Sequence, residues 1–434
     1  MINTAKKAYA KRIIEAEITE LLDMLPALAI NGAKGVGKTV SASRLAGSRL
    51  QLDEPNTAAV IAADLEVIAR NKKPVLIDEW QKIPVVWDFV RRQVDADFSP
   101  GRYILTGSAM PPKGVSLHSG AGRIVNVRMR PFSLQERDLA RPLIGIGDLL
   151  KHKPGLDFSG ATKITLSDYA EEIVSSGFPG IRPLARRAQK AQLDGYIENI
   201  ITKEFAEQGR ELRRPDTFRR WLRAYAAATG GTASYETILR AATGGQANKP
   251  SPITTLGYRD MLSQLWILDQ IEPWLPLASP FSGLGQSPKH FLVDPALSAR
   301  VLNITVDQLV KTPDALSAAL GPQDEKIMLG RLFESLVALS LQTYARANEA
   351  KLSHLRTANG RHEVDFIIEK NNKLIGLEVK LSATLNKNDV RHLNWLAETF
   401  TDYEVVKVVL TAGQHAFYRK EDDIYVIPAV LLGV

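Results

Sequence analysis

Residues 32–39 read GAKGVGKT and directly follow the apolar run ALAIN. Glycines in such a loop let backbone N–H groups approach a phosphate closely, and a helix that starts after the loop adds the positive end of its dipole. Lys38 is expected to reach the β- and γ-phosphates, and Thr39 to place its hydroxyl on Mg²⁺. The spacing therefore predicts a phosphate-binding loop for a nucleotide such as ATP. The expected contacts are Gly32, Ala33, Lys34, Gly35, Val36, Gly37, Lys38 and Thr39.

Two acidic residues end the next long apolar run, PVLIDEW. Asp78 is expected to support Mg²⁺ and to contact the bound nucleotide complex, and Glu79 to activate a water as the base of hydrolysis. The run RYILTGS follows, and its Ser108 would reach the same sheet edge, where a hydroxyl can sense the γ-phosphate or hold the attacking water. Solvated acids at a strand end and a capping hydroxyl are the simpler alternatives.

An arginine lies beyond this serine, in the segment GAGRIVNVRMRPFSLQE. Arg123 precedes an apolar run, where its guanidinium could reach the nucleotide of a neighbouring subunit. Such a contact requires a homo-oligomer. Arg128 and Arg130 are weaker candidates for the same role, and a surface or intrasubunit arginine is an open alternative.

The C-terminal region contains a second set of acids, in HEVDFIIEKNNKLIGLEVK. Strand alternation and hairpin pairing would bring Asp365, Glu378 and Lys380 together, and neither acid has an obvious basic partner except Lys380. The two acids would hold Mg²⁺ or Mn²⁺, while Lys380 positions or activates a water for attack on a phosphodiester. Glu334, on an otherwise apolar helix, is placed to add a carboxylate. A solvated hairpin face and a binding module without catalysis are the alternatives.

The sequence also resembles a known group of proteins. The motifs GAKGVGKT, LIDEWQKIP, LTGS, SGAGR and RPFSLQE look like the AAA-type ATPase domain of a large prokaryotic family whose C-terminal half is a domain of unknown function. Further matches are SSGFPGIRP, KHFLVDPAL and GRLFESLVALSL, so the resemblance covers nearly the whole chain. It implies an ATPase core, a helical winged-helix-like middle and a C-terminal fold like restriction endonucleases. The pattern D-x12-E-x-K resembles the core of the PD-(D/E)XK nucleases.

The middle of the chain reads mostly helical, with an arginine-rich segment, RRPDTFRRWLR. A helix from about residue 216 to 228 would bury Phe218, Trp221, Leu222 and Tyr225 and leave its arginines outside. WILDQIEPW and KHFLVD are expected to supply two wing-like strands. The arginines could contact nucleic-acid phosphates or form a solvated face. They are Arg213, Arg214, Arg219, Arg220 and Arg223.

The composition restricts the classes of protein to consider. With 434 residues, 45% hydrophobic and 24% charged, the chain fits about three globular domains and excludes collagen-like, coiled-coil and wholly disordered proteins. The absence of cysteine excludes disulfides, a thiol nucleophile and cysteine-ligated metal. The net charge of +7 favours polyanions only mildly. No run of about 20 apolar residues occurs, so we expect a cytoplasmic protein without a membrane anchor.

These patterns predict an α/β multidomain protein. We expect an AAA-like P-loop domain at 1–139, a helical, winged-helix-like domain at 140–320 and a restriction-endonuclease-like α/β domain at 321–434. The predicted function is Mg-dependent ATP binding and hydrolysis by an oligomer, coupled to nucleic-acid binding, remodelling or cleavage. The alternative is a nucleotide-driven switch or scaffold whose nuclease-like domain recognises a partner without catalysis.

Overall fold

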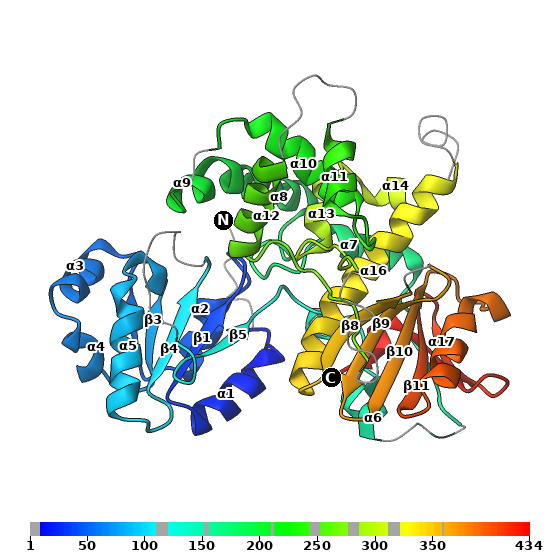
Figure 1. Cartoon of the computed structure of the whole chain (residues 1–434), viewed down its shortest axis with the longest axis horizontal. Coiled ribbons are helices and arrows are strands. Elements are labelled where there is room, and N and C mark those ends of the chain that lie inside the picture. Colours follow the sequence, from blue (N-terminus) through cyan, green and yellow to red (C-terminus); the bar gives the residue numbers. More distant parts are fainter. Residues whose placement is uncertain are drawn as a thin grey trace, which may run out of the picture.

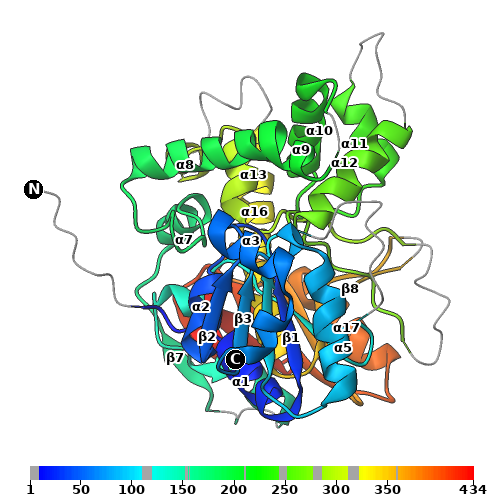
Figure 2. The ribbon, with the colours of Figure 1, turned by 90° about the vertical axis from the view of Figure 1, so that its left-hand side faces the viewer.

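Figure 1 shows the computed structural model as an N-terminal sheet, a helical middle and a C-terminal sheet. The helical middle lies above both sheets, and Figure 2, turned by 90°, shows the N-terminal sheet in front of the C-terminal one. The structure describes residues 9–109, 120–151, 155, 157–209, 212–243, 252–276, 286–310, 322–357 and 360–434.

Five strands form the N-terminal sheet: β1 (Ala27–Asn31), β2 (Ser48–Gln51), β3 (Val75–Asp78), β4 (Tyr103–Gly107) and β5 (Val125–Arg128). All their pairings are parallel, in the order β2-β3-β4-β1-β5. The central strands are buried from end to end, as is typical of parallel strands covered on both faces. Ile30 and Asp78 lie opposite Thr106, so the carboxyl ends of three strands meet at one edge. This confirms the predicted parallel sheet.

Helices cover both faces of this sheet. The helices on one face are α1 (Ile14–Met24) and α2 (Lys38–Leu45), and those on the other are α3 (Pro55–Ala63), α4 (Glu66–Arg70) and α5 (Val85–Ala96). Because strand residues alternate in direction, Leu28 and Ile30 pack toward α1, while Ala27 and Ala29 pack toward α5. A 3₁₀ turn, η1 (Trp80–Lys82), lies just after β3, and another, η2 (Gln135–Arg137), follows β5.

The middle of the chain is helical. Its elements are α8 (Arg186–Asn199), the π-helical turn η3 (Ile200–Glu204), α9 (Phe205–Glu207), α10 (Pro215–Ala227), α11 (Tyr235–Ala242), α12 (Pro252–Gln264), α13 (Pro295–Val301) and α14 (Val306–Val310). The predicted stripe on α10, from Phe218 to Tyr225, is buried in the core that also covers the α1 face of the N-terminal sheet. The two expected wing strands are reduced to isolated antiparallel bridges, Leu268 with Leu292 and Ile271 with Lys289. The winged-helix likeness therefore stays a prediction.

A seven-stranded mixed sheet forms the C-terminal unit. Its later strands are β8 (Lys351–Arg356), β9 (Glu363–Lys370), β10 (Lys373–Lys380), β11 (Glu404–Thr411), β12 (His415–Arg419) and β13 (Ile424–Pro428). The long helix α16 (Pro322–Ala347) packs on one face and α17 (Lys387–Thr399) on the other. The restriction-endonuclease likeness stays a prediction.

The expected alternation along β9 breaks near its start. Ser353 pairs with Ile367 and Leu355 with Val364, so β9 has one more residue than β8 between these pairs. Such a bulge turns the side chains before it. Val364 accordingly packs with Ile367 on the α17 side, and does not share the face of Phe366, as strict alternation along the strand would require.

The expected division at residue 140 does not follow the packing of the described residues. The elements there are β6 (Ile144–Gly145), α6 (Ile146–Lys151), β7 (Ser159–Ala161) and α7 (Leu166–Val174). β7 completes the C-terminal sheet by pairing with β12, and β6 pairs with β14 (Leu432–Gly433), which follows the turn η4 (Ala429–Leu431). β6, α6 and β7 thus pack with the C-terminal unit, which local sequence patterns do not reveal. The predicted boundary at 320–321 lies outside the described residues.

No helix in the described ranges has both the length and the apolar content needed to span a membrane.

Candidate active site

The loop between β1 and α2 has the shape that its glycines require. Gly32 lies so close to Met129 that a Cβ would be 2.2 Å from the Met129 carbonyl oxygen. Gly37 has φ +101, in the left-handed region that other residues avoid, and α2 begins directly after it. The chain therefore turns from a buried strand into a helix N-terminus with its backbone N–H groups at the strand ends, as predicted for a phosphate-binding loop.

Lys38 is buried with only backbone carbonyls as hydrogen-bond acceptors. Its Nζ donates to the Gly32 oxygen at 2.8 Å and to the Ala33 oxygen at 3.0 Å. Within the described part of the chain, no carboxylate lies at ion-pair distance from this nitrogen. Burial lowers the pKa of Lys38 to about 8, although the nearby charges of Glu79 and Asp78 partly oppose the shift. A buried ammonium without a carboxylate partner is stabilised by an incoming phosphate.

Asp78 links the ends of β3, β4 and α2. Its Oδ1 accepts hydrogen bonds from the hydroxyls of Thr39, at 2.8 Å, and of Thr106. Its Oδ2 forms an ion pair with Arg49 Nη2 at 2.8 Å. The carboxylate therefore holds the Thr39 hydroxyl at the mouth of the loop. A hydroxyl backed by a carboxylate is the donor set that holds Mg²⁺ beside a nucleotide, so these residues fit the metal.

Glu79 is turned away from the strand direction and is held by neutral donors. It has φ 54, a left-handed conformation that is unusual for glutamate and is often found at functional sites. Its Oε2 accepts hydrogen bonds from Ser108 Oγ, at 2.9 Å, and from Gln81 Nε2. Ser108 therefore contacts the expected base directly. The contact of Gln81 was not predicted. Only its position two residues after Glu79, in the turn η1, could have indicated that contact from the sequence.

The arginines beyond β4 lie elsewhere. Arg123 is 45% exposed, and its Nε pairs with Asp95 of the same chain at 2.8 Å. This is the alternative in which the arginine acts within its own subunit. Its contact to a second subunit stays a prediction. Arg128 and Arg130 both pair with the buried Asp269 of the middle unit, so these weaker candidates are already neutralised within the chain.

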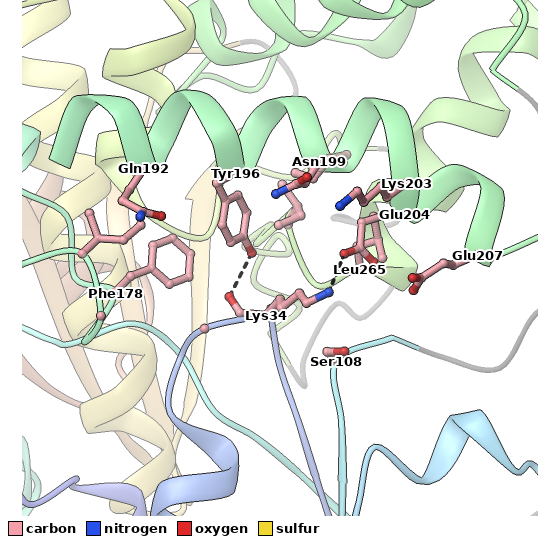
Figure 3. Close-up of a pocket in the computed structure, with 15 residues that line it drawn as sticks. Lys34, Ser108, Phe178, Gln192, Tyr196, Asn199, Lys203, Glu204, Glu207 and Leu265 are labelled. Atoms are coloured by element: carbon pink, nitrogen blue, oxygen red, sulfur yellow. Dashed lines mark hydrogen bonds and ion pairs between the residues drawn. The ribbon is translucent and has the colours of Figure 1, made fainter. Parts of the chain in front are cut away.

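Two cavities adjoin the loop. One of about 350 Å³ lies between Lys34 and Ser108 on one side and α8 and η3 on the other, as Figure 3 shows. Across it, Lys34 Nζ pairs with Glu204 at 3.1 Å and the Tyr196 hydroxyl donates to the Lys34 carbonyl at 3.1 Å. The other, of about 550 Å³, lies beside α2 and is lined by Tyr9, Arg12, Gly37, Val40 and Phe132 among others.

The C-terminal acids are close together, but a lysine that the sequence analysis missed lies between two of them. Lys289 Nζ contacts Glu334 at 2.7 Å and Asp365 at 2.8 Å. This corrects the expectation that Lys380 is the only basic partner. Lys380 instead pairs with Glu378 at 3.3 Å. In the sequence, Lys289 could have been noticed as a lysine at the start of the apolar run KHFLVD. In the structure it lies opposite Ile271.

The predicted metal set of Glu334, Asp365 and Glu378 therefore does not fit a free divalent-cation site. An ammonium takes the contacts that a metal ion would make to two of the three carboxylates. No group of three or more histidine, aspartate or glutamate side chains with metal-holding geometry occurs in the described residues.

All five predicted nucleic-acid arginines are exposed, as expected from the α10 stripe. They differ in their partners, since Arg219 pairs with Glu198 at 2.8 Å and with Asp216 at 3.1 Å. Arg220 donates to the Thr217 hydroxyl at 3.2 Å. Nucleic-acid contact by this segment stays a prediction.

Comparisons with known proteins give family matches for three parts of the chain. Residues 25–137 match the model of an AAA domain, while residues 166–308 and 329–432 match two different domains of unknown function. Uncharacterized proteins of Mycobacterium tuberculosis and Mycobacterium bovis are each 24% identical over 430 residues, covering 96% of this chain and 83% of theirs. A Walker-type ATPase of Pyrococcus abyssi is similar over 69% of this chain and 98% of its own, with 16% identity and a TM-score of 0.41. The chain thus contains an AAA-type P-loop ATPase domain, followed by regions whose matches carry no assigned function.

Proposed function

We propose that the protein is a Mg-dependent ATPase that acts as a nucleotide-driven switch on its own middle and C-terminal units. The observation that carries the proposal is the buried Lys38, whose acceptors are the carbonyls of Gly32 and Ala33. An ammonium in this position is ready for the β- and γ-phosphates, and the acids of β3 lie beside it.

Each residue of the site has a distinct role in this proposal. The backbone N–H groups of residues 32–37 and the N-terminus of α2 hold the triphosphate, and Lys38 offsets the negative charge that develops on it. Thr39 and Asp78 would hold Mg²⁺, which neutralises phosphate charge when bound. Glu79 takes the proton of the attacking water, and Ser108 orients that carboxylate.

The two cavities suggest how the nucleotide lies. The 550 Å³ cavity beside α2 has the larger volume of the two and is lined by Phe132, so we place the base and ribose there. Arg12 also lines this cavity, where it lies over the Phe132 ring and donates to the Val36 carbonyl at 2.7 Å. The 350 Å³ cavity is lined by Ser108 and is therefore the side from which water reaches the γ-phosphate.

A buried ion-pair cluster supports coupling to the rest of the chain. β5 lies beside β1, which leads into the phosphate loop, and the Met129 N–H donates to the Asn31 carbonyl at 2.7 Å. Arg128 and Arg130 then pair with Asp269 of the middle unit at 3.0 and 2.7 Å. Arg130 also donates to Gln342 on α16. A shift of the loop on nucleotide exchange would thus act on both other units.

Two substitutions would test the ATPase proposal, because they separate ATP binding from ATP hydrolysis. Lys38→Ala should weaken ATP binding and lower kcat by at least about 100-fold, because it removes a preorganised charge from the phosphate site. Glu79→Gln should bind ATP normally but stop turnover, because only the base is lost. The assays are steady-state ATP hydrolysis and nucleotide titration calorimetry, with the exposed Lys72→Ala as control. Equal loss of binding in both site variants would contradict the assigned roles.

Nucleic acid is the partner class that we propose for the switch, on the basis of the exposed arginines around α10. ATP hydrolysis should then be stimulated by single-stranded, duplex or branched DNA, and the combined change of Arg220 and Arg223 to Ala should weaken that stimulation, most clearly at low salt. Stimulation by none of these DNAs, with basal turnover intact, would leave a switch that acts on a protein partner. Cleavage is the less favoured candidate, because Lys289 occupies the acidic cluster.

We also propose a homo-oligomer in which Arg123 of one subunit approaches the nucleotide of the next. Its exposed position supports this role, since the side chain is 45% exposed and its pairing partner Asp95 is also on the surface. An exposed ion pair is easily exchanged for another partner.

A further inference from the structure

The acidic cluster of the C-terminal unit is built around a fully buried lysine. Lys289 is 1% exposed, and its Nζ lies between a carboxylate of α16 and a carboxylate of β9. The ammonium also lies 5.2 Å from the centre of the Phe366 ring, on a favourable cation–π path. Three elements that are far apart in the sequence therefore meet at one nitrogen atom.

The local backbone structure directs the side chains of Lys289 and Asp365 toward each other. Lys289 lies in the segment that pairs with Ile271, and the two residues exchange backbone hydrogen bonds of 2.9 and 3.1 Å. Asp365 lies in the bulged stretch of β9, and bulges commonly redirect a side chain. Its second oxygen accepts from the Val379 N–H at 3.0 Å, which fixes the carboxylate on β10.

The charges of the cluster are balanced without a metal ion. Burial by itself would lower the pKa of Lys289, but Asp365 and Glu334 outweigh it and raise that pKa. Burial likewise tends to raise the pKa of Asp365, yet the lysine holds it below its usual value. Glu334 is different, since burial dominates and raises its pKa to about 7.

The third acid is a poor ligand for the same reason. Glu378 is 4% exposed, and its Oε1 is buried without a hydrogen-bond partner in the described residues. Burial and the neighbouring Asp365 charge raise its pKa well above the usual value. Its Oε2 already pairs with Lys380 at 3.3 Å, so a metal ion would have to compete with a second ammonium.

We propose that Lys289 is the resident cation of this cluster, occupying the position of a divalent metal and fastening the middle unit to the C-terminal sheet. The cluster is then an internal ion-pair contact, and no Mg²⁺ or Mn²⁺ binds while Lys289 is in place. Removal of one partner from a buried ion pair leaves an uncompensated charge, which is strongly destabilising.

The same paired segment reaches the ATPase domain. Asp269, which binds Arg128 and Arg130, donates its N–H to the Phe291 carbonyl at 3.0 Å. Asp269 and Lys289 therefore lie on two short segments that isolated antiparallel bridges join, with ion pairs to the units on either side. This placement makes Lys289 a fixed anchor for that segment, independent of any metal.

The test measures thermal unfolding of the full chain without nucleotide, so it does not depend on ATP hydrolysis. Lys289→Met should lower Tm by several degrees. Adding Mn²⁺ should raise the Tm of Lys289→Met, because the charges of Glu334 and Asp365 that lose Lys289 can then bind it, and should leave the wild type unchanged. The control is Lys373→Met, which breaks a partly exposed pair with Glu404 on the same sheet and should have little effect.

A second variant keeps the proposal testable if Lys289→Met does not fold. Lys289→Met combined with Asp365→Asn removes one charge of each sign, so it should recover part of the lost Tm and show no Mn²⁺ response. Mn²⁺ titration of the wild type, with Asp365→Asn for comparison, provides the independent measurement. Saturable Mn²⁺ binding by the wild type that is lost in Asp365→Asn would overturn the proposal, as would an unchanged Tm of Lys289→Met.

Discussion

Two buried lysines, Lys38 beside the phosphate loop and Lys289 in the C-terminal cluster, lie in opposite electrostatic settings. Lys38 is 5% exposed and donates only to carbonyls, so burial lowers its pKa to about 8. Lys289 is 1% exposed and lies between two carboxylates, which raise its pKa against the effect of burial. A buried lysine therefore indicates a ligand site only when no carboxylate beside it already balances its charge.

The acids beside the two lysines differ in the same way. Asp78 accepts hydrogen bonds from the hydroxyls of Thr39 and Thr106 and also forms an ion pair with Arg49. Glu79 is held by Ser108 and Gln81, and such neutral donors orient a carboxylate without cancelling its charge. In the C-terminal cluster, Asp365 is held by an ammonium, so its charge is already offset. The first site is prepared for a metal–phosphate complex, and the second is complete in itself.

The largest effect that would sharpen this comparison is a pH dependence of nucleotide binding. Because burial lowers the pKa of Lys38 to about 8, the free protein loses this charge above pH 8. ATP binding requires the charged form, so affinity should fall by about tenfold per pH unit between pH 8 and the higher pKa of the complex. Nucleotide titrations at pH 7, 8 and 9 measure this. Lys38→Met should bind weakly at every pH, and a flat wild-type profile up to pH 9 would show that Lys38 is compensated after all.

The folded-state pKa of Lys38 also sets the sign of a stability effect. Its value lies below the unfolded one, so the lysine destabilises the fold below pH 8, and this cost disappears as the pH rises toward 10.5. Lys289 has the opposite shift, and its contribution is present at all pH values below the unfolded pKa of a lysine.

A smaller effect tests whether neutral donors orient Glu79. Ser108→Ala removes a 2.9 Å hydrogen bond to its carboxylate, and the loss of a hydrogen bond to a charged group costs roughly 1.5 kcal/mol. We expect kcat to fall by about tenfold with little change in KM, measured by steady-state ATP hydrolysis against the exposed Ser99→Ala. An unchanged kcat would mean that Gln81 alone positions the base, or that Glu79 is not the base.

The residues predicted for the phosphate site lie together because the chemistry is local in sequence, and their roles stay predictions. Gly32 and Gly37 lie in one loop, and the acids and Ser108 each end a strand of one parallel sheet, so their meeting follows from strand direction. Gln81 was missed because its contact depends on the left-handed backbone of Glu79 and on the turn η1. No pattern of residue types indicates that conformation.

Predictions failed where the partner comes from a distant segment. Asp365 and Glu378 lie on a paired hairpin as predicted, but Lys289, 76 positions before Asp365, contacts Asp365 only through tertiary packing. The bulge in β9 was also invisible, because the register of a strand depends on its neighbours. The same reason explains β7, whose short segment joins a sheet built mostly from the end of the chain.

The sequence by itself determined the phosphate loop, the parallel sheet and the acids at its strand ends, because glycine spacing and buried apolar runs leave few other structures for these segments. Only the tertiary structure decided which charges are balanced. A lysine's role depends on the acceptors around its nitrogen, and for Lys38 these lie within six residues, whereas for Lys289 they lie 45 and 76 residues away. Burial strengthens each of these interactions, so the distant partners decide whether a site binds a ligand or holds the fold together.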